Sequence, residues 1–280
     1  MQSVHAQHAY NLSVVRLPDG PTHAPHASLL SSLGDAMTAA AALRATPASS
    51  AKPHLKLSPA APTPRTPLLV DLRPRMPAVY DQGTLGSCTA NALCGATQYM
   101  WPAAGPGSRL FVYYNERLLE NDIPDDAGAY LCDGVIALEK YGVCSEARWP
   151  YDVAEFATAP PATCYADAAG HLLPTAHAVP PTLAAMKQCI ALGYPFVVGI
   201  QIYGSFETAQ VATTGVVPMP AAGDALLGGH AVLCVGYNDL KKQWTMRNSW
   251  GAGWGAKGYF YLPYDYLVDP ALSSDAWTLH

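Results

Sequence analysis

Two short segments of the chain have residue types that can support nucleophilic catalysis by a thiol. Cys88 follows Gly86 and Ser87 at the start of an apolar run that predicts a helix, and Ser87 is a good helix-capping residue. A helix N-terminus and a neighbouring imidazolium both lower the pKa of a thiol, which favours the reactive thiolate. His230 follows a glycine pair and begins a run typical of a β-strand. We therefore expect Cys88 to be a nucleophile and His230 to be its general base.

Two side-chain amides complete this set. Gln82 lies six residues before Cys88, and its amide beside the Cys88 backbone N–H would form an oxyanion hole. Asn248 can accept a hydrogen bond from the ring of His230 and fix its tautomer, while Trp250 and Trp254 shield that bond from water. A cysteine taken alone is more often a buried structural residue. The four residue types in this order favour catalysis over that alternative.

The elements that must position these residues fall into two halves. Helical patterns cover 88–101, 108–120 and 133–141, and a shorter helix is expected at 183–192. Strands are expected at 196–200, 230–237, 243–246 and 259–262. Helices followed by strands predict an α+β protein with a cleft between two lobes, 67–180 mainly helical and 181–280 mainly β.

Residues 1–66 differ in composition from the rest and are rich in Ala, Pro, Ser and His. One helix is expected at 26–44, but the segment has too few large apolar residues for a core of its own. We expect it to be an arm that precedes the catalytic body. Its paired histidines, His5 with His8 and His23 with His26, lack acidic or cysteine partners, so we predict no metal site there.

Composition argues against several classes of protein. A net charge of −5 provides no basic face, so nucleic acid is not expected as a partner. No apolar run is long enough for a membrane span, and no signal peptide is visible after Met1. Localisation therefore stays open, either cytoplasmic or exported by a route that the sequence does not reveal. No nucleotide-binding glycine motif or Cys-x-x-Cys pair is present, and no cofactor is predicted.

From residue 70 to the end, the sequence resembles the papain family of cysteine peptidases. The resemblance rests on Gln82, Cys88, His230 and Asn248, and on the motifs Tyr141-Gly142-Val143, Trp149-Pro150-Tyr151 and Gly258-Tyr259-Phe260. The Asn-Ser-Trp-Gly motif and its neighbours are most similar to a bacterial branch, the xylellain-like enzymes. Leu85 and Thr89 depart from the family pattern, since members have a disulfide cysteine and an aromatic residue there.

The resemblance implies a two-lobed fold, with a helical left lobe, a β-barrel-like right lobe and the active site between them. It implies a cysteine endopeptidase that forms a thioester on Cys88 and acts on peptide or protein substrates. Gly128, Gly229, Ala231 and Trp250 are the expected substrate-binding residues, although a turn or packing role for the glycines is equally compatible.

The resemblance also implies that the 1–66 arm is a pro-segment, so that the chain is a zymogen blocked by an intramolecular inhibitor. A disordered leader is the alternative. Two other functions stay open on the same scaffold: a catalytically silent peptide-binding module, and an aminopeptidase or acyl transferase. The seven cysteines are an odd number, so at least one is unpaired within the chain. Cys144 and Cys164, which flank the Trp149-Pro150-Tyr151 motif, are a candidate disulfide pair.

Overall fold

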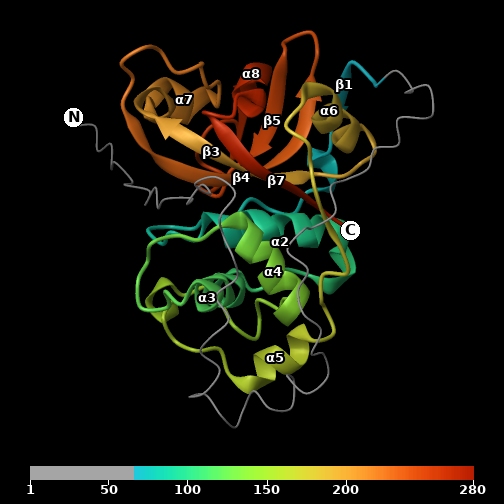
Figure 1. Cartoon of the computed structure of the whole chain (residues 1–280), viewed down its shortest axis with the longest axis vertical. Helices are drawn as coiled ribbons and strands as arrows, with labels where there is room; N and C mark the ends of the chain where they lie inside the picture. Colours follow the sequence, from blue (N-terminus) through green and yellow to red (C-terminus); the bar gives the residue numbers. More distant parts are fainter. Residues whose placement is uncertain (1–65) are drawn as a thin grey trace.

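The computed structural model describes residues 66–280, which form two packed halves (Figure 1). The predicted arm, its expected helix at 26–44 and its histidine pairs lie outside the described residues, apart from Thr66 at the boundary. Helices α2 to α5 occupy one half and the sheet occupies the other, with α2 between them. Among residues 66–280, no helix combines the length and apolar character needed to cross a bilayer.

The helical half contains α2 (Cys88–Met100), α3 (Arg109–Glu120), α4 (Leu131–Tyr141) and α5 (Ala162–Ala168). Helix α3 begins where the Ser108 hydroxyl accepts a hydrogen bond from the Phe111 N–H, and it ends at Asn121, whose left-handed conformation closes the last turn. Helix α2 consists largely of small residues and is buried along almost its whole length. Small side chains let it approach strand β4 closely, and a Cβ at Gly95 would lie only 3.3 Å from Nε of Arg247.

The other half is an antiparallel sheet. Its strands, in spatial order, are β2 (Ala176–Ala178), β7 (Ser273–Leu279), β3 (Phe196–Tyr203), β4 (Leu226–Asn238), β5 (Gln243–Arg247) and β6 (Tyr259–Pro263), and β1 (Leu69–Asp71) also pairs with β4. The end strands β2 and β6 do not pair, so the sheet is open. Short helices α6 (Leu183–Ala191), α7 (Ala209–Thr214) and α8 (Tyr264–Val268) flank it.

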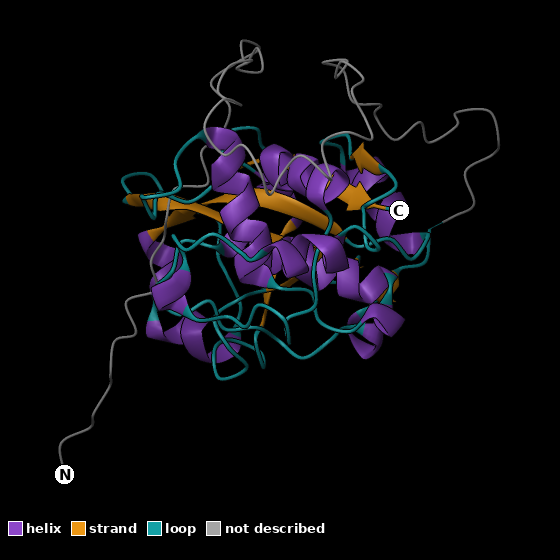
Figure 2. Cartoon of the chain, turned by 90° about the horizontal axis from the view of Figure 1, so that it is seen from below, coloured by secondary structure: helices purple, strands orange, loops and turns teal. Residues whose placement is uncertain are grey.

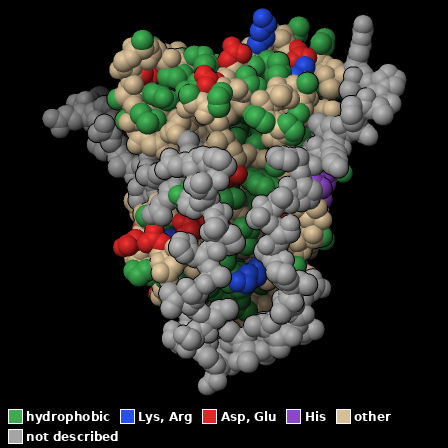
Figure 3. Space-filling view, viewed as in Figure 1, with side chains coloured by type: hydrophobic (Ala, Val, Ile, Leu, Met, Phe, Trp, Pro, Cys, Tyr) green, Lys and Arg blue, Asp and Glu red, His purple; other side chains and the backbone are tan. Residues whose placement is uncertain are grey.

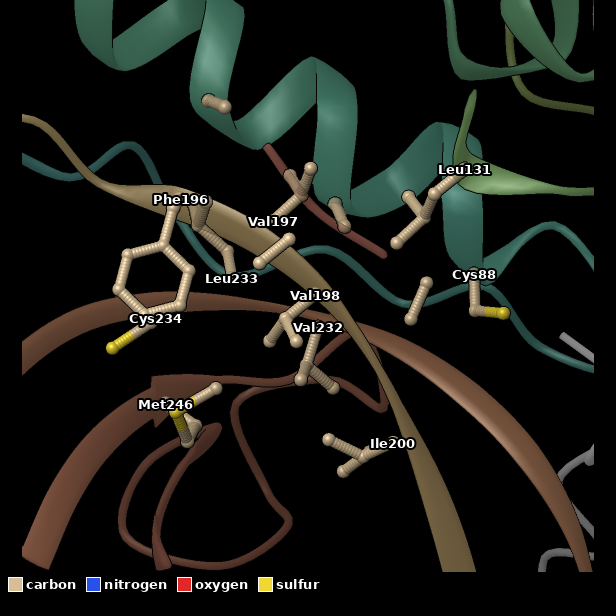
Figure 4. Close-up of a cluster of buried hydrophobic side chains, with 14 of the residues drawn as sticks. Cys88, Leu131, Phe196, Val197, Val198, Ile200, Val232, Leu233, Cys234 and Met246 are labelled. Carbon is tan, nitrogen blue, oxygen red and sulfur yellow. The ribbon is translucent and has the colours of Figure 1, made fainter. Parts of the chain in front are cut away.

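The core between the halves is apolar. Leu233 of β4, which pairs with Val197 of β3, packs against helix α2 at Gly95. Val198 and Val232 lie on the other face of the sheet, with Ile200 and Met246 (Figure 4). Figure 2 shows from below how the helices lie across the sheet. On the face seen in Figure 3, hydrophobic side chains gather over the sheet half, and Lys and Arg side chains are few.

The predicted α+β, two-lobed fold is confirmed, with local differences. Helix α4 begins two residues earlier than expected, and β4 begins at Leu226 rather than at His230, so His230 lies inside a strand. The glycines before His230 are therefore strand residues: Gly228 pairs with Ile202, and Gly229 with Gln201. Strands β1, β2 and β7 were not predicted, because their sequences are short or polar.

Candidate active site

Cys88 is the first residue of α2 and is 2% exposed. The loop before Cys88 is held by a distant residue of the helical half: the Gly86 N–H donates to Asp126 Oδ1 at 2.9 Å. Ser87 occupies the N-cap position, but its hydroxyl does not cap the helix, so the expected capping role is wrong. That hydroxyl instead lies 2.5 Å from the hydroxyl of Tyr151.

Burial raises the pKa of the Cys88 thiol, and three backbone N–H groups oppose that effect: those of Cys88, Thr89 and Ala231. The first two belong to the start of α2, and the third belongs to the residue after His230. Cys88 therefore lies at the helix N-terminus, but the lowered thiol pKa that the sequence predicted from this position is not found. Burial outweighs these N–H groups and raises the pKa of the Cys88 thiol to about 12.

His230 on β4 lies beside Asn248, the first residue after the neighbouring strand β5. The Nε2 atom of His230 lies 2.8 Å from Asn248 Oδ1. The same oxygen accepts a hydrogen bond from the Ser249 N–H at 2.9 Å, and since that group can only donate, the Asn248 amide must point its oxygen this way. His230 Nε2 therefore carries hydrogen, and the Nδ1 atom of a neutral ring is left as the basic nitrogen.

The His230 ring is covered by aromatic side chains. Trp250 stacks on it with ring centroids 4.9 Å apart, and Trp254 meets Trp250 edge-on at 5.0 Å. This is the shielding arrangement that the sequence predicted for the two tryptophans. Burial lowers the pKa of His230 to about 4, against the opposing effect of the Asn248 hydrogen bond.

Gln82 is held at both ends of its side-chain amide. Its Oε1 accepts from the Ser249 hydroxyl at 2.5 Å, and its Nε2 donates to the Leu85 carbonyl at 3.0 Å. One N–H of Nε2 is left over for another acceptor. Ser249 thus contacts both Asn248 and Gln82. Sequence reasoning missed this role, although Ser249 is the residue that follows Asn248 in the motif.

The structure also places the predicted substrate-binding residues. Gly128 has a φ of 80°, which favours glycine, and its N–H donates to the Tyr113 hydroxyl at 3.3 Å. Tyr113 in turn donates to Asp126, the residue that holds Gly86. Gly128 is therefore linked to the loop that contains Cys88 through Tyr113 and Asp126, and no sequence pattern marks these two residues. Gly229 and Ala231 flank His230 on β4.

All seven cysteines are free thiols. Cys144 and Cys164 are buried beside Phe111 as free thiols, so this candidate pair forms no disulfide. Thr89, which stands where an aromatic residue was expected, donates from its hydroxyl to buried Glu116 at 2.7 Å. Within residues 66–280 there is no group of three His, Cys, Asp or Glu side chains arranged to hold a metal ion.

Residues 66–268 match the family described as papain family cysteine protease. The chain belongs to this family. It is 40% identical over 220 residues to an uncharacterized peptidase C1-like protein of Acanthamoeba polyphaga mimivirus, over 74% of this chain and 70% of the viral protein. It is 31% identical over 201 residues to the thiol protease aleurain of Arabidopsis thaliana, where the match covers 66% of this chain but 51% of aleurain.

Solved structures of the family have the same fold. Xylellain, a cysteine protease from Xylella fastidiosa, superposes with a TM-score of 0.72 at 39% identity, covering 76% of this chain and 86% of xylellain. This confirms the predicted xylellain-like branch. Digestive procathepsin L 3 of Tenebrio molitor superposes with a TM-score of 0.61 at 20% identity, covering 78% of this chain and 71% of the procathepsin, and supports the fold alone. By family and fold, the chain is a cysteine-type peptidase.

Proposed function

We propose that this papain-family chain is an endopeptidase that uses Cys88 as its nucleophile and His230 as its general base and acid. The observation that carries the proposal is the fixed His230–Asn248 pair, which leaves Nδ1 of His230 as the basic nitrogen. The backbone N–H of the next residue, Ala231, is among the groups that lower the pKa of the Cys88 thiol against the effect of burial. This tautomer supports a role for His230 in taking the proton of the thiol.

The reaction begins from a neutral thiol and a neutral imidazole, because burial penalises either charge alone. His230 takes the proton as the sulfur attacks the substrate carbonyl carbon, and the carbonyl π electrons move onto oxygen. The Cys88 N–H and the remaining Nε2 hydrogen of Gln82 stabilise that oxyanion. When it collapses, the C–N bond breaks and His230 protonates the leaving amine, which leaves a thioester on Cys88.

Hydrolysis of the thioester reverses these roles. A water molecule loses a proton to His230 as its oxygen attacks the thioester carbonyl, and the sulfur then leaves with that proton restored to it. The products are two shorter peptides and the original thiol. We extend the proposal to Gly128, Gly229, Ala231 and Trp250 as substrate-binding residues, since Gly128 is tied to the Cys88 loop and the other three surround His230.

The proposal includes the 1–66 arm as an inhibitory pro-segment. It is supported by the position of the arm, which directly precedes the part of the chain that matches the family, beginning at residue 66. Proteolytic removal of such a segment is a familiar way to release an enzyme from inhibition.

The test is cleavage of a mixed fluorogenic peptide library under reducing conditions. The full chain and a chain beginning at Thr66 are compared, each beside its own Cys88→Ala control. We expect the shorter chain to cleave at least tenfold faster, and both controls to be silent. Equal rates would remove the inhibitor from the proposal but leave the peptidase. Silence of both folded proteins would instead favour the peptide-binding module, and release of single N-terminal residues would favour an aminopeptidase.

A further inference from the structure

The hydroxyl of Tyr151 lies between the two segments that supply the oxyanion donors. It donates to the backbone carbonyl of Gln82 at 3.0 Å, and it lies 2.5 Å from the hydroxyl of Ser87, the residue before Cys88. Gln82 supplies the side-chain donor of the proposed oxyanion hole, and Cys88 supplies the backbone donor. One hydroxyl group on the Trp149-Pro150-Tyr151 loop therefore connects both segments.

The directions of these hydrogen bonds follow from the groups involved. A carbonyl oxygen only accepts, so the single hydroxyl hydrogen of Tyr151 goes to Gln82. The hydrogen of Ser87 must then go to Tyr151, and Ser87 Oγ in turn accepts from Asn91 Nδ2 at 3.0 Å. The chain of donors runs in one direction, from Asn91 through Ser87 and Tyr151 to Gln82. This use of the Ser87 hydroxyl is why it does not cap helix α2.

Arg109 and Glu146 hold the ring and backbone of Tyr151 in place. The guanidinium of Arg109 lies 3.9 Å from the ring centroid, and its Nη2 donates to Glu146 Oε1 at 2.8 Å. The same Glu146 oxygen accepts the Tyr151 backbone N–H at 3.2 Å. Arg109 Nη1 also donates to Asn91 Oδ1 at 3.3 Å, which orients the amide that begins the donor chain. Ring, backbone and hydroxyl of Tyr151 are each held.

We propose that Tyr151 is a positioning residue for the oxyanion hole: its hydroxyl sets the spacing between the Gln82 segment and the Cys88 N–H. The inference rests on the proposed function, because an oxyanion hole has meaning only if Cys88 attacks a carbonyl. It assigns Tyr151 no contact with substrate. Burial raises the pKa of the Tyr151 phenol to about 12, so the hydroxyl keeps its hydrogen at neutral pH.

The test separates oxyanion stabilisation from thiol reactivity. Tyr151→Phe is compared with wild type in whichever form, full chain or chain from Thr66, hydrolyses peptide. Two rates are measured: kcat and KM on a fluorogenic peptide, and alkylation of Cys88 by iodoacetamide, which involves no oxyanion. We expect kcat to fall about tenfold, with KM and the alkylation rate each within about twofold of wild type.

Two further variants keep the test decisive. Tyr165→Phe is the matched control, because it removes a hydroxyl that donates to Asn115 at 3.1 Å in the helical half, away from the oxyanion segments. Ser87→Ala removes the other partner of the Ser87–Tyr151 hydrogen bond, and it replaces Tyr151→Phe in the test if that variant does not fold. Ser87→Ala is expected to show the same split, and the double variant to be little worse than the poorer single variant.

An unchanged kcat in Tyr151→Phe, or parallel losses of kcat and alkylation rate, would overturn the inference. Parallel losses would show that Tyr151 merely supports the Cys88 region. A wild-type protein that is alkylated at Cys88 but cleaves no peptide in either form would overturn the proposed function, and the inference with it. That outcome is distinct, because it appears before any variant is made.

Discussion

The imidazole Nε2 of His230 and the amide Oδ1 of Asn248 meet at 2.8 Å, although 18 residues separate them in the sequence. Strands β4 and β5 are paired, with Leu233 opposite Arg247, so His230 on β4 lies close to Asn248, the residue directly after β5. The Ser249 N–H holds the amide oxygen in place, and Trp250 covers the ring. The tautomer of His230 is thus set by an amide whose own orientation is fixed by the backbone of the next residue.

Asn248→Ala should lower kcat/KM by about tenfold to a hundredfold. It removes one hydrogen bond to the ring, and a bond of this kind contributes roughly 1 to 3 kcal/mol when a charged form is involved. The measurement is steady-state hydrolysis of a fluorogenic peptide. Asn238→Ala is the control, because its side chain only closes a turn with the Lys241 N–H. Equal activity in Asn248→Ala and wild type would show that the ring needs no orientation by this amide.

Gln82→Ala should lower kcat by about 10²- to 10³-fold, the usual effect of removing one oxyanion donor. Alkylation of Cys88 by iodoacetamide should stay within about twofold of wild type, because that reaction forms no oxyanion. The pair of rates is measured on Gln82→Ala and on Gln210→Ala, an exposed residue of α7. If the alkylation rate fell by the same factor as kcat, Gln82 would instead be needed for the reactivity of the Cys88 thiol.

His230 should make stability depend on pH. Its pKa is lowered from 6.5 to about 4 by burial, so between these values the unfolded chain binds a proton that the folded chain does not. The contribution of His230 to stability is therefore fully present above pH 6.5 and falls by about 3 kcal/mol as the pH drops to 4. His230→Gln removes this dependence.

The measurement for His230 is urea unfolding at several pH values between 7 and 4. The difference in free energy of unfolding between wild type and His230→Gln should change over that range in favour of the variant. His171→Gln, at an exposed position, serves as the control. A constant difference between wild type and His230→Gln would contradict the buried, neutral imidazole.

Much of this arrangement could be predicted from the sequence. Helix α2 could be located because Pro102 follows an apolar run, and β5 and β6 because they are short β-branched or aromatic runs between turn residues. Gln82, Cys88, His230 and Asn248 could be named because their chemistry is specific and they occur in order. The strand containing His230 was placed four residues too late, since two glycines normally mark a turn rather than a strand.

The supporting residues could not be predicted, because their roles depend on contacts between distant segments. Tyr151 reaches Gln82 across 69 positions, and Asp126 reaches Gly86 across 40. A tyrosine or an aspartate has no distinctive spacing that would reveal such a partner. Strand β7 was missed for a related reason: Ser273–Leu279 is polar at its start and gains its strand conformation by pairing with β3 and β2.

Glu116 offers a test of the packing behind the nucleophile. Burial raises its pKa well above 4.5, with Glu120 and Asp133 adding to the effect and Thr89 and Arg117 opposing it. A raised carboxyl pKa means that the folded chain keeps a proton that the unfolded chain loses. Stability from this group is present below pH 4.5 and is lost as the pH rises.

Glu116→Gln should therefore stabilise the protein relative to wild type at pH 8 more than at pH 4. The amide keeps the shape of the carboxylic acid and does not ionise. Urea midpoints at the two pH values provide the measurement, with exposed Glu155→Gln as the control. A loss of stability in Glu116→Gln that is larger at pH 8 would mean that the buried carboxylate is ionised and favourably paired.

The most direct test of the central claim is to identify the residue that carries the acyl group during turnover. The active form is mixed with a peptide ester, quenched in acid within milliseconds to seconds, digested with pepsin and mapped by mass spectrometry. The account predicts an acyl group on the fragment that contains Cys88, none on the other six cysteines, and neither acylation nor hydrolysis in Cys88→Ala. Hydrolysis that persists in Cys88→Ala, or an acyl group on another residue, would contradict it.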